Sequence, residues 1–170
     1  FNNDGLFDLF TGGENGTNTL HLNHGNWVFE DVTAASGLAL TGTVYNVTVG
    51  DFDNDGDVDL YVPVYDAPDV LYVNRGDGNF DRVNVGSPLT EGSKNSATWV
   101  DYNNDGFLDL FEPCGDGTPT LNLLYRNSLP QYGNTNHWLK LRLKGTASNA
   151  SAIGARVWAR AIIAGREIWQ

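Results

Sequence analysis

The residues best suited to chemistry are carboxylates gathered in a short, Asp-rich stretch, Asp51-Phe-Asp-Asn-Asp-Gly-Asp-Val-Asp59, which we call loop two. Counted from Asp51, oxygen-bearing side chains stand at positions 1, 3, 5 and 9 and glycine at position 6, and the position-7 carbonyl can point inward. Calcium takes about six to eight oxygen ligands, and alternate side chains of one tight loop supply most of them. The spacing therefore predicts a calcium site.

Two further stretches carry the same pattern. Loop three is Asp101-Tyr-Asn-Asn-Asp-Gly-Phe-Leu-Asp109, and loop one is Phe1-Asn-Asn-Asp-Gly-Leu-Phe-Asp8, in which position 1 has no residue. The sequence thus predicts up to three Ca²⁺ ions. The predicted ligands are side chains or, at position 7, backbone carbonyls: Asn2, Asp4, Leu6 and Asp8; Asp51, Asp53, Asp55, Asp57 and Asp59; Asp101, Asn103, Asp105, Phe107 and Asp109.

Three other interpretations of the loops are weaker. An EF-hand needs a bidentate glutamate at position 12 and flanking helices, but position 12 is Thr11, Val62 or Glu112, and the flanking residues favour strands. Magnesium prefers fewer carboxylates and more water. Simple polar turns would not fix acids at positions 1, 3, 5 and 9 in three copies.

The elements that position these loops repeat with them. The Asp-Gly pair recurs at Asp4, Asp55 and Asp105, a period of 51 and then 50 residues, which is typical of propellers and other arrays. In the middle repeat, β-branched and aromatic residues predict strands at 45–49, 58–64, 70–73 and 79–83, with a hairpin turn at 75–78. The fold class is therefore all-β, with about three four-stranded propeller-type blades. Residues 32–38 predict one helical turn.

Charge divides the chain. The net charge is −11, which argues against nucleic acid and anionic membrane surfaces as partners; no apolar run is long enough for membrane insertion. The first 135 residues carry a net −16 and the remainder +5, so we predict domains at 1–133 and 134–170, joined by a polar linker near 128–136. One domain with a long loop is the alternative. In the tail, residues 139–144 alternate and predict a β segment with a basic face.

No catalytic constellation is visible. Cys114 is the single cysteine, so an internal disulfide is excluded, and we expect a buried or free thiol. The three histidines show no zinc spacing with it. No local Ser-His-Asp or Cys-His signature occurs, and the sequence predicts a protein that is not an enzyme.

The loops and their surroundings, over about residues 1–127, resemble FG-GAP/VCBS repeats, whose Asp-x-Asp-x-Asp-Gly-x-x-Asp loops bind Ca²⁺ within β-propeller blades. The tail, from Asn136-His-Trp-Leu through Ile153-Gly-Ala-Arg-Val157, resembles the start of an ASPIC/UnbV domain. The combination is similar to the cartilage-acidic-protein-like (CRTAC) family. This resemblance implies a secreted, extracellular or cell-surface β-propeller protein.

The resemblance favours a non-enzymatic, calcium-binding extracellular module for adhesion or for protein or glycan binding. One alternative is the propeller part of a polysaccharide lyase or dehydratase, for which Tyr72, Arg75 and His24 stand near predicted strand ends. Another is a structural subunit of an extracellular polymer. Because a propeller ring takes about four to eight blades, we expect further blades of a longer chain, or further copies, to pack against these repeats.

Overall fold

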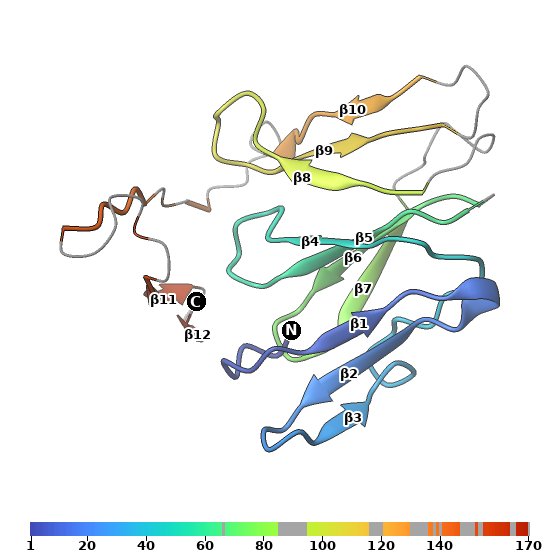
Figure 1. The fold of residues 1–170 in the computed structure, drawn as a ribbon, viewed down its shortest axis with the longest axis horizontal. Coiled ribbons are helices and arrows are strands. Elements are labelled where there is room, and N and C mark those ends of the chain that lie inside the picture. Colours follow the sequence, from blue (N-terminus) through green and yellow to red (C-terminus); the bar gives the residue numbers. More distant parts are fainter. Residues whose placement is uncertain are drawn as a thin grey trace.

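The computed structural model of the chain describes residues 1–65, 67–84, 95–115, 121–129, 136–137, 139, 141–146, 152, 155–163 and 166–169. Three antiparallel sheets lie one above another, in the order of the three repeats (Figure 1). Each sheet corresponds to one repeat of the sequence, so the predicted all-β fold with three propeller-type blades is confirmed. The described residues do not form a closed ring.

The middle sheet has the four strands that the sequence predicts, in the order β4-β5-β6-β7. The strands of the first, middle and third sheets are β1 (Leu9–Thr11), β2 (Thr19–Asn23) and β3 (Phe29–Asp31); β4 (Thr48–Gly50), β5 (Asp59–Val62), β6 (Val70–Asn74) and β7 (Phe80–Asn84); β8 (Thr98–Val100), β9 (Asp109–Glu112) and β10 (Leu123–Tyr125).

The other two sheets have three strands each. In the first, the chain enters at loop one, so no residues correspond to β4. In the third, residues 130–135, which come after β10 in the sequence, lie outside the described part. The strand predicted at 45–49 is wrong at its start: it begins at Thr48, because the preceding segment instead approaches Tyr65 through the bridge at Thr43.

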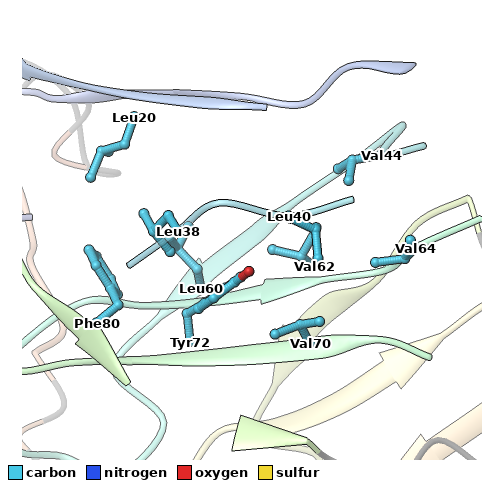
Figure 2. Packing of buried hydrophobic residues seen from close by; sticks show 10 residues of the cluster. All are labelled: Leu20, Leu38, Leu40, Val44, Leu60, Val62, Val64, Val70, Tyr72 and Phe80. Carbon is cyan, nitrogen blue, oxygen red and sulfur yellow. The ribbon is translucent and has the colours of Figure 1, made fainter. Parts of the chain in front are cut away.

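The core lies between neighbouring sheets and follows from strand alternation. Leu60 and Val62 of β5 and Tyr72 of β6 are fully buried in one cluster with Leu20 of the first sheet, and Leu38 and Leu40 lie between the two sheets (Figure 2). The intervening Tyr61 points the other way and packs edge-on against Trp99 of β8, with ring centroids 6.1 Å apart. A blade with two apolar faces is thus covered on both sides, which is why β5 is buried along its whole length.

Helical structure is confined to single turns. The predicted turn at 32–38 is confirmed, since the Ser36 amide donates to the Val32 carbonyl at 2.8 Å. A 3-10 turn, η1 (Glu14–Gly16), was not predicted. Within the described residues there is no helix of the length and apolarity that crossing a membrane requires.

The tail contributes a two-stranded hairpin of β11 (Arg160–Ile163) and β12 (Arg166–Trp169). The strand predicted at 139–144 is wrong for its described residues, which lie in no strand. Alternation alone does not make a strand without a partner for its backbone, and Leu139, Leu141 and Leu143 are exposed. Most of the predicted linker lies outside the described residues, and nothing tests the predicted domain boundary.

Candidate metal centre

The three Asp-rich loops lie on the same side of the stack of sheets, the left in Figure 1. Loop one leads into β1, loop two joins β4 to β5, and loop three joins β8 to β9. Position 9 is the first residue of β5 and of β9. The repeat period therefore places three equivalent loops in a row along one edge.

Each loop is held by side-chain oxygens that accept backbone N–H groups. In loop two, Asp51 accepts the amides of Asp55 and Gly56, both at 3.0 Å. In loop three, Asp101 accepts those of Asp105 and Gly106 at 3.1 Å. The position-3 side chain also accepts the position-5 amide in all three loops. These bonds turn the oxygens of positions 1, 3 and 5 toward the inside of the turn.

Two backbone positions make this tight turn possible. Glycine at position 6 has a positive φ of 83°, 92° and 88° in loops one to three. Asparagine at position 4, which is Asn3, Asn54 or Asn104, also lies in the left-handed region, with φ of 59°, 59° and 58°. Glycine and asparagine tolerate this conformation best. Sequence reasoning explained the glycine but missed the asparagine, although it repeats as faithfully.

The position-9 aspartate is the buried anchor of each loop. One oxygen of Asp59 accepts the Phe52 amide at 3.0 Å and the other accepts the Asn74 amide at 2.9 Å. Asp109 is bound in the same way by Tyr102 and Asn127. A carboxylate oxygen has two lone pairs, so these bonds orient Asp59 and Asp109 and leave acceptor capacity for a cation.

Loop two concentrates negative charge. Carboxylate oxygens of Asp51, Asp53 and Asp59 lie within 4.8 Å of one another. Burial, which takes the charged form out of water, raises the pKa of Asp51 and of Asp53 to about 6, and repulsion from Asp55 adds to both. Burial likewise raises the pKa of Asp59 to about 8, against two backbone hydrogen bonds that lower it. A divalent cation bound here would offset this negative charge.

Loops one and three relieve part of this charge internally. At position 3 they carry an asparagine, whose amide donates to the position-5 carboxylate: Asn2 to Asp4 at 3.0 Å and Asn103 to Asp105 at 2.9 Å. Arg126 also lies 4.0 Å from Asp105. Among the described residues, the close triplet of carboxylates is found in loop two alone.

The donor set of loop two suits calcium. It consists of oxygen only, with four carboxylates at positions 1, 3, 5 and 9. The side chain of Asp57 is buried and accepts a hydrogen bond from Asn3, so its own carboxylate belongs to the contact with loop one. The position-7 carbonyls of Leu6, Asp57 and Phe107 stay predicted ligands. Glu112, the one candidate for an EF-hand position 12, lies inside β9 opposite Leu123.

A second asparagine repeats in the sequence, but sequence reasoning assigned it no role. Asn23 ends β2, Asn74 ends β6, and Asn127 stands two residues after β10. The side-chain amide of each donates to a carbonyl of its own repeat: Phe7, Val58 and Leu108. Asn74 donates in addition to the Phe1 carbonyl at 2.8 Å, and Asn127 to the Phe52 carbonyl at 2.7 Å. The signal was present, because all three occupy one register in the repeat.

The side chains considered for an enzymatic cleft have separate surroundings. Tyr72 is fully buried in the core. Arg75 forms a bidentate ion pair with Asp81 on the β6–β7 hairpin, and His24 pairs with Glu30 at 2.8 Å. Cys114 is buried, as expected.

Comparison with known proteins gives one family. The model of the family described as FG-GAP-like repeat matches residues 1–62 and 64–112. These residues include all three loops and the strands from β1 to β9. No curated protein matches the sequence.

Proposed function

The chain belongs to the FG-GAP-like repeat family, and from that premise we propose that it is a non-enzymatic β-repeat module that binds calcium in its three Asp-rich loops. The observation that carries the proposal is the carboxylate triplet of loop two, whose oxygens lie within 4.8 Å. Calcium accommodates many carboxylate oxygens from one flexible loop. Bound there, it would neutralise charges that burial otherwise penalises.

The biological role that fits best is adhesion, or binding of a protein or glycan, outside the cell. The FG-GAP-like repeat family is typically extracellular and adhesion-related. Loops on one edge of a rigid stack of sheets are where binding surfaces usually lie. We extend the proposal to the tail, whose resemblance to an ASPIC/UnbV domain and to the CRTAC family stays a prediction, since the family match ends at Glu112.

Metal counting and unfolding test the proposal together. Saturating calcium should raise the free energy of unfolding over that in chelator by about 2.7 kcal/mol per site at 100-fold excess over Kd. Asp55→Ala should remove one ion from the bound count. Asp77→Ala is the matched control, because Asp77 is exposed in the β6–β7 turn and its hydrogen bonds are local ones from Asn79.

Equal unfolding midpoints in calcium and chelator would overturn calcium binding. An unchanged ion count in Asp55→Ala would instead remove loop two from the sites. The role outside the cell has its own test. Immobilised calcium-loaded protein should retain protein or glycan ligands from extracellular matrix, and chelator should release them.

A further inference from the structure

We infer that the loops of neighbouring repeats are energetically coupled, so that a cation bound in one loop raises the affinity of the next. The position-4 asparagines, Asn74 at the end of β6 and Asn127 after β10 carry this coupling. The inference rests on the proposed cation binding. It goes further by assigning a role to residues that are not ligands. It also contradicts the simple expectation that sites in separate repeats act independently.

The first link joins the loops directly. Asn54, at position 4 of loop two, donates its side-chain amide to the carbonyl of Gly106 in loop three at 3.0 Å. Asn54 stands between the ligands Asp53 and Asp55. Gly106 stands between Asp105 and Phe107. The bond therefore connects a side chain of loop two to the backbone of loop three, next to predicted ligands in both loops.

The same link is present one repeat earlier. Asn3, at position 4 of loop one, donates to the side chain of Asp57 in loop two. Its acceptor differs from that of Asn54, being a carboxylate of position 7 and not a carbonyl of position 6. In both cases an asparagine held at positive φ reaches across the boundary between sheets.

The second link runs through the anchor aspartates. The backbone amide of Asn127 donates to Asp109 of loop three at 2.7 Å, and its side chain donates to the Phe52 carbonyl of loop two at 2.7 Å. Phe52 in turn donates its amide to Asp59 of loop two at 3.0 Å. A chain of three hydrogen bonds thus joins the position-9 aspartates of two loops. Asn74 makes the corresponding bonds between loops one and two.

These links supply a physical route for coupling. A cation draws the oxygens of positions 1, 3, 5 and 9 inward and orders their loop. Both links end on residues beside those oxygens, so a cation in one loop also restricts the neighbouring loop. The neighbouring loop then loses less conformational entropy when it binds its own cation. Such coupling is reciprocal between the two sites. The two coupled ligands are divalent cations, one in each of two neighbouring loops.

The test is a linkage measurement by calcium calorimetry. Emptying loop three with Asp105→Asn should weaken calcium binding at loop two by about fivefold or more, the lower range of measured couplings. Asn54→Gly removes the linking amide while glycine keeps the positive φ. In that background the effect of Asp105→Asn on loop two should shrink, and it should fall to less than about twofold when Asn127→Ala removes the second link as well.

Asn104→Gly is the matched control. Asn104 has the same position and φ as Asn54, but in the described residues no other loop accepts a hydrogen bond from it. The coupling should survive this change. If loop two keeps its affinity when loop three is emptied in the wild-type background, the coupling is overturned while calcium binding stands. If neither loop binds calcium at all, both proposals are overturned.

Discussion

Loops two and three have the same backbone turn and the same hydrogen bonds from backbone amides to the side chains of positions 1 and 3. They differ in how much negative charge their side chains carry. Loop two has Asp53 at position 3, and its carboxylates crowd together. Loop three has Asn103 there, whose amide donates to Asp105, with Arg126 nearby. In loop three the Asp105 carboxylate is thus partly neutralised by neighbouring side chains, whereas in loop two burial, with repulsion from Asp55, raises the pKa of Asp51 and Asp53.

The difference separates two requirements that a repeat motif combines. Backbone geometry needs only an oxygen acceptor at position 3, which aspartate and asparagine both provide to the position-5 amide. Charge balance depends on which of the two is present. An aspartate at position 3 should therefore lower stability without metal and raise affinity for metal, and an asparagine should do the opposite.

The largest expected effect is on pH dependence. The pKa of Asp51 and Asp53 is about 6 and that of Asp59 about 8 in the folded, cation-free chain, whereas unfolded aspartate has a pKa of about 4. Between those values the folded chain binds more protons than the unfolded chain. Stability in chelator should therefore fall as pH rises from about 4 to about 8.

Even one pKa unit for each of the three carboxyls would amount to about 4 kcal/mol. Urea unfolding in chelator across this pH range measures the loss, and saturating calcium should remove most of it. Asp53→Asn should flatten the curve by deleting one titrating group. Stability that rises over this interval would contradict the raised pKa values of Asp51, Asp53 and Asp59.

The second prediction exchanges the position-3 residues of loops two and three. Asp53→Asn gives loop two the position-3 amide of loop three, and Asn103→Asp does the reverse. In chelator the first change should stabilise the fold and the second destabilise it, by about 1 kcal/mol each, the size of one hydrogen bond or exposed charge contact. Calcium affinity should fall about tenfold in the first and rise in the second, because it follows ligand charge.

Calcium titration of each variant, with unfolding in chelator beside it, measures both quantities. The double variant Asp53→Asn/Asn103→Asp keeps total charge unchanged and controls for it. Should both single changes shift affinity in the same direction, position 3 would not set the difference between the loops.

Much of this fold could be predicted from sequence, because its signals are local and repeated. The Asp-Gly pair with acids at fixed spacing predicted the loops, and the run of β-branched and aromatic residues at 70–73 predicted β6. What escaped prediction depends on partners distant in the sequence. Residues 139–144 alternate as well, but they have no neighbouring strand among the described residues. Asn127 looks like an ordinary loop residue until Phe52, far away along the chain, is seen beside it.

The smallest effect comes from Arg126, a further group in the surroundings of loop three. Its guanidinium lies 4.0 Å from Asp105 and is more than half exposed, and strand register places Val73 at the same position beside loop two. Exposed ion pairs contribute about 0.2–1 kcal/mol. Arg126→Val should therefore lower stability in chelator by less than about 1 kcal/mol and strengthen calcium binding at loop three slightly, since a competing cation is lost.

Arg82→Val, which removes the same charge from β7, controls for net charge, and added salt should diminish the Arg126 effect by screening it. A loss of calcium affinity in Arg126→Val would assign the arginine to ordering loop three, and neutralisation of Asp105 would then rest on the Asn103 amide alone.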